Sequence, residues 1–225
     1  MLFHVTPWKE VVMATRVERK QASLLRILDA AAARLRTEGL MGAAIGLVMR
    51  DAKLTHGAFY SHFANKEELT AAAFRHALAN NRTRWTTGPS GEHWPQRLTR
   101  LAKRYLTPAH RDDPANGCAF AAVASEAARS PAEFRRVFEA EMIQSLRAIC
   151  GPTAAPSANP DPNGVDPTRH DEAIALLALC VGGVTLARAV EDGETSARVL
   201  AACQAAAARL ANPEGATDSA TRAVD

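Results

Sequence analysis

Apolar residues recur at helical spacing along most of the chain, most clearly near its beginning. Between Arg16 and about Arg36 they fall at steps of three and four residues, which places them on one face of a helix. They are Leu24, Leu28, Ala31 and Leu35. Gly39 follows, and glycine readily adopts the positive φ that commonly ends a helix. The pattern predicts a long first helix that ends near Gly39.

Two short helices are predicted after it, separated by a tight turn. Residues 43–52 carry apolar side chains at helical spacing, and Lys53-Leu54 forms the turn. The hydroxyl of Thr55 can cap the second short helix, residues 55–60. A long basic helix followed by two short helices is a helix-turn-helix arrangement.

The second short helix combines polar and aromatic residues. Thr55, His56 and Tyr60 are directed outward, and their hydroxyl and imidazole groups can reach DNA bases or phosphates. Phe59 and Phe63 face inward and anchor the helix. The polar face is therefore a candidate DNA-binding surface.

A further helix begins directly after this segment. Asn65 is a good N-cap, and Glu68 follows at the spacing of a capping box. A helix N-terminus attracts phosphate, and Lys66 lies on the first turn. We therefore expect phosphate contacts here to position the amino-terminal domain on DNA.

The segment 16–70 resembles the DNA-binding domain of the TetR (tetracycline repressor) family, most specifically in the pattern F-Y-x-H-F-x-x-K-E-x-L at residues 59–69. The resemblance implies that residues 55–60 enter the major groove. It also implies that Tyr60, His62 and Lys66 meet the phosphate backbone. The expected DNA contacts are Arg16, Lys53, Thr55, His56, Gly57, Tyr60, His62 and Lys66.

Two positions depart from the family pattern. Lys53 stands at the turn position where the family usually carries glycine, and Ala43 or Ala44 replaces the usual Ser or Thr cap of the preceding helix. Loss of such a cap costs about 1 kcal/mol. Lys53 can add a phosphate contact.

The chain divides into an amino-terminal head and a helical body. We expect residues 1–15 to be disordered or extended, residues 16–63 to form the DNA-binding domain, and residues 64–212 to form a regulatory and dimerisation domain. Within the body, the proline-rich stretch 151–167 is a flexible linker, and residues 213–225 are a disordered tail. The predicted fold class is all-α, with a three-helix helix-turn-helix domain followed by a ligand-binding and dimerisation bundle.

Turn and cap signals divide the body into helices. Residues 88–91 form a loop, and the polar, proline-bearing stretch 108–116 is a connection. Ser130 and Pro131 give the start signal of a helix that reaches Cys150, with Ser130 as the cap. The last two helices are expected at about 168–190 and 195–210.

Apolar residues of the body helices supply a candidate pocket and a candidate dimer interface. The pocket candidates are Trp94, Leu98, Tyr105, Phe120, Phe134, Phe138, Met142 and Leu177. The last two helices have broad apolar faces, and the resemblance implies that these helices pair with their copies in a dimer. The interface candidates are Ile174, Leu177, Val181, Val184, Val199, Cys203 and Leu210. An ordinary intramolecular core is the alternative for these positions.

Charge and cysteine content refine this interpretation. The formal net charge is only +3, but residues 1–82 hold 12 Lys and Arg against 7 Asp and Glu, which suits a basic binding head. The four cysteines are scattered without metal-ligand spacing, as expected of reduced thiols, and we expect no metal and no cofactor. The first residues lack the order of a signal peptide, no run approaches the length of a membrane span, and the predicted location is the cytoplasm. Met13 is an alternative start.

These patterns lead to one principal hypothesis and one alternative. The principal hypothesis is a homodimeric repressor that binds a palindromic double-stranded operator and is released by a small-molecule effector. In the alternative, Cys118 at a helix start acts as a thiol sensor on the same scaffold. No nucleophile elbow, phosphate loop or zinc motif is present, so an enzyme is not expected. The effector, the operator and activation as opposed to repression stay open.

Overall fold

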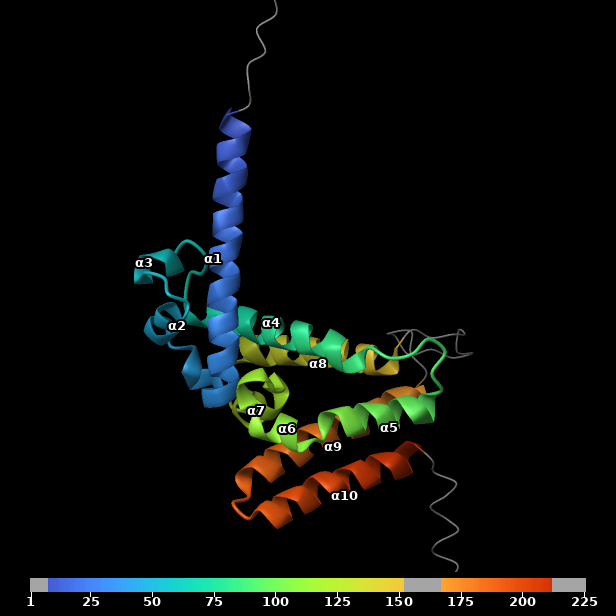
Figure 1. Cartoon of the computed structure of the whole chain (residues 1–225). Coiled ribbons are helices and arrows are strands. Elements are labelled where there is room, and N and C mark those ends of the chain that lie inside the picture. The colour runs from blue at the N-terminus through green and yellow to red at the C-terminus, as the bar shows by residue number, and fades with distance from the viewer. Residues whose placement is uncertain (1–7, 152–166, 212–225) are drawn as a thin grey trace, which may run out of the picture.

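The computed structural model describes residues 8–151 and 167–211, and within these ranges every regular element is helical, as predicted. Helix α1 (Trp8–Glu38) stands upright in Figure 1, with the short helices α2 (Ile45–Asp51) and α3 (His56–Phe59) along one side. The helices of the body run across the lower part of α1. The predicted tail and nearly all of the predicted linker lie outside the described residues.

The head has a small core of its own. Ile27 of α1, Val48 of α2 and Phe59 of α3 are fully buried in it. Leu69 and Ala73 of the next helix, α4 (Lys66–Thr86), complete this core. Because α4 also packs in the body, one continuous helix belongs to both parts of the molecule.

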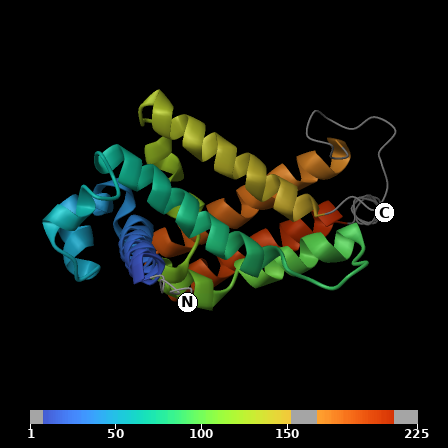
Figure 2. The same ribbon diagram turned by 90° about the horizontal axis from the view of Figure 1, so that it is seen from above.

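The body consists of helices that extend to the same side of α1, which is seen end-on in Figure 2. They are α5 (Trp94–Tyr105), α6 (Pro108–Asp112), α7 (Ala119–Ala127), α8 (Ala132–Cys150), α9 (Pro167–Ala189) and α10 (Gly193–Ala211), with the short 3-10 helix η2 (Pro114–Asn116) between α6 and α7. A second 3-10 helix, η1 (Gly39–Ala43), follows α1. Gly39 has φ +69°, as predicted for the end of the first helix.

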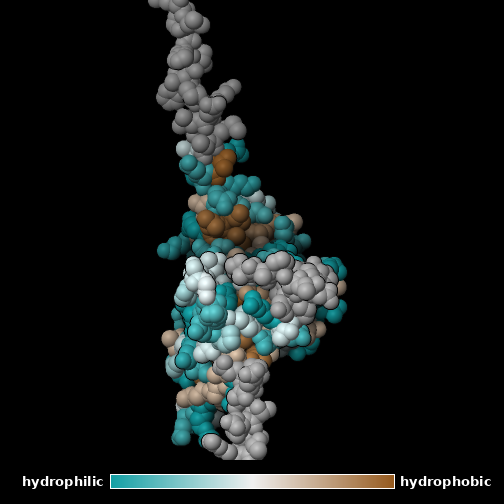
Figure 3. All heavy atoms as spheres, turned by 90° about the vertical axis from the view of Figure 1, so that its right-hand side faces the viewer, coloured by the Kyte–Doolittle hydropathy of each residue, from teal (hydrophilic) through white to brown (hydrophobic). Residues whose placement is uncertain are grey.

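Helix α1 begins earlier than the sequence pattern predicts. It starts at Trp8, so the expectation of a disordered or extended start is wrong for residues 8–15. The sequence between Trp8 and Gly39 contains no proline or glycine that would interrupt a helix. In Figure 3, hydrophobic surface gathers where α1 rises above the body, and Val17 and Leu25 are exposed on this helix.

The prolines of the polar stretch 108–116 start helices, although we predicted an irregular connection. Pro108 is the first residue of α6 and follows Thr107, whose hydroxyl accepts a hydrogen bond from the backbone N–H of His110 at 3.1 Å. Pro114 is the first residue of η2 and follows Asp113, whose side chain accepts a hydrogen bond from the backbone N–H of Asn116. Proline suits the first helical position because its missing N–H would be unpaired there.

Two predicted caps are not formed by side chains. The hydroxyl of Thr55 makes no capping bond to α3. Helix α8 begins one residue later than a Ser130 cap requires, with Pro131 at the cap position, and the Ser130 hydroxyl donates to the carbonyl oxygen of Glu126 at 2.9 Å. The Ser130 side chain therefore closes the end of α7, not the start of α8.

Helix α9 is the longest apolar stretch of the described chain. By length and composition, Thr168–Ala189 is able to cross a membrane, contrary to the expectation that no run approaches that length. In this fold it packs against α5, α7, α8 and α10, as the core helix of a bundle does. Gly183 permits the close packing, because a Cβ there would lie 2.8 Å from Leu106 and 2.9 Å from the Cys203 sulfur.

Candidate nucleic-acid interface and cavity

The turn between α2 and α3 contains a strained residue. Lys53 has φ +55°, and within residues 8–151 and 167–211 no other non-glycine residue has a positive φ. Arg26 of α1 donates hydrogen bonds to the carbonyl oxygens of Ala52 and Lys53, the latter at 3.0 Å. Helix α1 therefore holds the turn in the conformation that presents α3.

Helix α3 places polar residues outward on an aromatic anchor, as predicted. Phe59 is fully buried, and its ring lies 5.8 Å from that of Phe63. Thr55, His56 and Gly57 are exposed. Tyr60 is 63% exposed although its ring contacts Phe59 edge-to-face at 5.1 Å. The exposed groups are a hydroxyl, an imidazole and a phenol, all able to form hydrogen bonds.

The remaining candidates for DNA contact differ in their surroundings. His62 is half-buried, and its Nε2 lies 2.8 Å from the hydroxyl of Ser23 in α1. Burial, with a smaller contribution from Lys20, lowers the pKa of His62, so the ring is neutral near pH 7. His62 therefore joins α3 to α1 within the head. Arg16, by contrast, is exposed on α1.

The start of α4 has the predicted cap. The side-chain oxygen of Asn65 accepts a hydrogen bond from the backbone N–H of Glu68 at 2.8 Å. The Glu68 carboxylate in turn accepts from the N–H of Ala64, also at 2.8 Å. Lys66 is half-buried on the first turn. The cap fixes this helix N-terminus beside α3.

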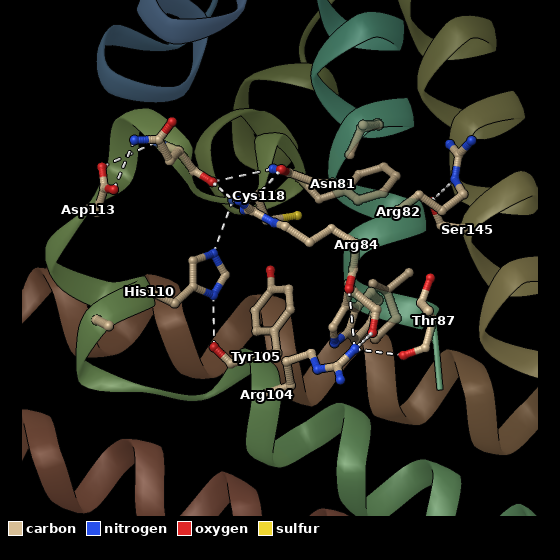
Figure 4. A pocket seen from close by; sticks show the side chains of 16 residues that line it. Asn81, Arg82, Arg84, Thr87, Arg104, Tyr105, His110, Asp113, Cys118 and Ser145 are labelled. Atoms are coloured by element: carbon tan, nitrogen blue, oxygen red, sulfur yellow. Dashed lines mark hydrogen bonds between the residues drawn. The ribbon is translucent and has the colours of Figure 1, made fainter. Parts of the chain in front are cut away.

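The body contains a cavity of about 780 Å³ that opens to solvent. It lies mainly between α4, α5, the α6–η2 segment and α7 (Figure 4). Its apolar wall is formed by Leu78, Trp85, Tyr105, Phe120 and Leu177. Its polar lining includes Asn81, Arg84, Arg104, His110, Asp113 and Cys118. A cavity of this volume has the size of a small-molecule site.

Three of the eight predicted pocket residues line this cavity: Tyr105, Phe120 and Leu177. Leu98 is fully buried in the core of the body, and Met142 packs against this core. The indole N–H of Trp94 donates to the carboxylate of Glu172. Phe134 and Phe138 lie 5.5 and 5.6 Å from the ring of Phe74. These five residues hold helices together.

Sequence reasoning missed much of the cavity wall. Trp85, Arg84 and Arg104 lie near the ends of α4 and α5, and His110 lies in the stretch that we predicted as a connection. The tight spacing of Thr107, Pro108 and His110 was the available signal, because it marks a capped helix start.

Tyr105 and His110 give the cavity its fixed polar groups. The Tyr105 hydroxyl is buried beside the Cys118 thiol, a weak hydrogen-bonding group, and finds no other partner in the described part of the chain. Burial raises its pKa, so the hydroxyl keeps its proton. Nε2 of His110 accepts from the backbone N–H of Cys118 at 3.1 Å, so Nδ1 carries the proton and donates to the Tyr105 carbonyl oxygen at 2.8 Å. Burial lowers the pKa of His110, which favours this neutral form.

Cys118 lies in the wall of the cavity at the start of α7, half-buried. Its backbone N–H is bound to His110, as described above. Thiol sensing by Cys118 stays a prediction.

The dimer candidates on α9 and α10 fall into two groups. Val184 is fully buried and Leu177 nearly so, which places both in the protomer's own core and removes them from a candidate interface. Ile174 is 46% exposed, and Leu186, which we did not predict, is 59% exposed. The half-buried candidates are Val181, Val199, Cys203 and Leu210.

A helix-turn-helix head with an exposed polar helix, carried on a helical body with a cavity, defines a class of DNA-binding transcription regulators. Residues 27–73 match the family model of bacterial regulatory proteins, tetR family. A TetR transcriptional regulator from Chloroflexus aurantiacus J-10-FL has a similar structure: TM-score 0.65, 25% identity, 85% of this chain and 94% of that one covered. Residues 27–73 therefore match the TetR family model, and the chain has the fold of TetR-family regulators.

Two further solved structures share the fold. A TetR-family regulator from Cytophaga hutchinsonii has a TM-score of 0.60 at 20% identity, covering 85% of this chain and 94% of that one. A putative TetR-family regulator from Rhodococcus sp. has a TM-score of 0.57 at 21% identity, covering 85% and 99%. No sequence among the curated proteins compared matches the chain. The protein is a DNA-binding transcriptional regulator.

Proposed function

We propose that this regulator is a homodimeric repressor that binds a palindromic operator and leaves it when a small molecule enters the cavity. The observation that carries the proposal is the exposed polar face of α3, fixed on buried Phe59 and joined through α4 to a body that contains the cavity. Such a regulator works in the cytoplasm, where it meets the chromosome and the effector together.

The proposed DNA contacts follow the exposure of the head residues. Thr55, His56, Gly57 and Tyr60 face base edges and phosphates of the major groove. The cationic side chains contact the phosphate backbone; they are Arg16, Lys53 and Lys66. His62 acts chiefly through its bond to Ser23, which positions α3.

The proposed dimer forms through the exposed residues Ile174 and Leu186 of α9, with half-buried Val199 and Leu210 of α10 beside them. Two recognition helices related by a two-fold axis read successive major grooves when they lie about 34–36 Å apart. An effector that favours another spacing releases the DNA, and the coupling needed is about 1–3 kcal/mol.

The test begins with selection of an operator from random DNA by the purified protein. On that operator, Tyr60→Ala should weaken binding at least about tenfold, a loss of about 1.4 kcal/mol, because it removes an exposed group of α3 without touching the buried anchor. Tyr60→Phe keeps the ring and separates its contribution from that of the hydroxyl. Full affinity in a folded Tyr60→Ala protein would refute the proposed interface.

A further inference from the structure

We propose that the cavity binds an organic anion with an aromatic body, whose acidic group is held by Arg84 and Arg104 and whose ring packs against Trp85 and Tyr105. The claim that such a molecule acts as the effector rests on the proposed function. The claim that it binds in the cavity does not rest on that function and is tested separately.

The first argument is the charge of two arginines in the wall. The guanidinium of Arg104 donates to the carbonyl oxygens of Arg84, Trp85 and Thr87, at 3.2, 3.1 and 2.7 Å. That of Arg84 donates to the Asn81 side chain at 3.3 Å and to the Asn116 carbonyl oxygen at 3.4 Å. In the described ranges neither arginine meets a carboxylate within ion-pair distance, and both are solvent-exposed at the cavity, so their charge is open to a ligand.

Other arginines of the body show the contrast. Arg82, which also borders the cavity, is paired with the buried carboxylate of Glu141. Arg100 binds Glu92 through two hydrogen bonds, at 2.5 and 2.7 Å. Arg84 and Arg104 are therefore charged groups left available to a ligand.

The other titratable groups of the wall do not cancel this charge. His110 is neutral, as its hydrogen bonds require. Asp113 is the acidic residue of the wall, and its carboxylate is occupied by the backbone and side-chain N–H groups of Asn116, at 3.3 and 2.9 Å. With Arg82 paired, two arginines face one aspartate, and the wall favours an anion.

The second, independent argument is the Tyr105 hydroxyl. Tyr105 is only 5% exposed, and its buried hydroxyl points toward the Cys118 thiol and the Arg84 side chain, with no partner in the described residues stronger than that thiol. Figure 4 shows the Arg84 side chain extending across the cavity above it. A buried hydroxyl is rarely left without a partner, and an oxygen of a bound acid would accept its hydrogen bond.

The apolar part of the wall selects the body of the ligand. The rings of Trp85 and Tyr105 lie 5.1 Å apart. The Trp85 N–H is occupied by the carbonyl oxygen of Leu101 at 3.0 Å, so the indole offers its apolar surface and not a donor. A flat aromatic ring packs well on such side chains.

The experiment compares two fluorescent probes with the same aromatic body on the purified full-length protein. One is 8-anilinonaphthalene-1-sulfonate, and the other is N-phenyl-1-naphthylamine, which lacks the acidic group. We expect the sulfonate to bind more tightly. Arg104→Gln and Arg84→Gln should each weaken its binding by about fivefold or more, since each removes a charge-assisted hydrogen bond, while binding of the neutral probe is unchanged.

Two further variants make the test specific. Lys103→Gln removes the same charge from the exposed neighbour of Arg104, outside the cavity wall, and should leave both affinities unchanged. Tyr105→Phe should weaken only the sulfonate, by about threefold or more. Binding of the neutral probe shows that each variant is folded.

The results separate the two proposals. Equal affinity for both probes, the same preference in all variants, or no binding of either probe would overturn the proposed anion site. Failure of the purified protein to select an operator would instead remove the repressor proposal and leave the probe result standing.

Discussion

Lys53 holds a backbone conformation that a side chain with a Cβ adopts only at a cost of about 1–2 kcal/mol. Lys53→Gly should raise the free energy of unfolding by about 0.5–1 kcal/mol, since part of the relief is offset by the freedom of glycine in the unfolded chain. Denaturant unfolding measures the change. Lys53→Ala removes the same charge but keeps the Cβ and should give no gain; an equal gain would show that charge, not φ, is responsible.

His110 makes stability depend on pH. Burial lowers its pKa in the folded protein, so the unfolded chain binds the proton more tightly and acid favours unfolding. Its contribution should be complete above the ordinary histidine pKa of about 6.5 and should be lost as the pH falls below it. Thermal unfolding at pH 7.5 and 5.5 tests this.

The matched variants are His110→Gln and His93→Gln. His110→Gln should lose less stability on acidification than the parent, whereas the substitution at exposed His93 should behave like the parent. An acid sensitivity that is identical in all three proteins would contradict the role of His110. His62, whose pKa burial also lowers, accounts for part of the sensitivity that remains.

At the residue scale, local pattern predicted the outer face of α3 but little of the cavity. Phe59 and Tyr60 are neighbours whose opposite environments follow from helical spacing alone. Phe134 and Phe138 satisfy the same kind of pattern on α8, yet they pack against Phe74 of α4 and stay outside the cavity. Which apolar side chains border empty space depends on how distant helices cross, and spacing within one helix does not contain that information.

At the element scale, Arg36 connects α1 with the body. Its guanidinium donates to the carbonyl oxygens of Ala77 in α4 and Ala115 in η2, both at 3.1 Å. The neighbour of Ala115, Asn116, borders the cavity. One side chain of the DNA-binding head therefore holds a segment of the cavity wall.

Arg36→Met should lower the free energy of unfolding by about 1–3 kcal/mol, since it leaves two carbonyl groups without their charged donor. It should also increase hydrogen exchange in both η2 and the second half of α1. Arg34→Met is the control, because Arg34 bonds to Glu38, Gly42 and Asp51 within the head. An Arg36 variant that leaves the exchange of η2 unchanged would argue against this connection.

Element boundaries were predictable where the signal is local. The Asn65–Glu68 cap placed the start of α4 correctly, and Gly39 placed the end of α1. Pro108 and Pro114 start helices that we predicted as irregular, because a proline fits both a turn and a first helical position. The preceding Thr107 and Asp113 decide between the two through their side-chain caps.

At the scale of the whole molecule, the proposed dimer rests on the exposed apolar residues of α9. The double variant Ile174→Glu and Leu186→Glu should convert a dimer to a monomer at micromolar concentration, because it would bury two unpaired charges at the interface. Sedimentation measures the mass. Leu25→Glu on α1, a comparably exposed apolar position in the head, should leave the dimer intact. A parent protein that is itself monomeric would remove the proposal.

The indole of Trp85 gives the molecule an optical signal of its own. The chain has three tryptophans, and of the two whose side chains the structure describes, Trp85 lines the cavity while Trp94 packs against Glu172. A compound that enters the cavity should change the polarity around the Trp85 ring, and with it the wavelength and intensity of its emission. Compounds can therefore be screened with unlabelled protein before its operator has been identified, with Trp94→Phe to reduce the background.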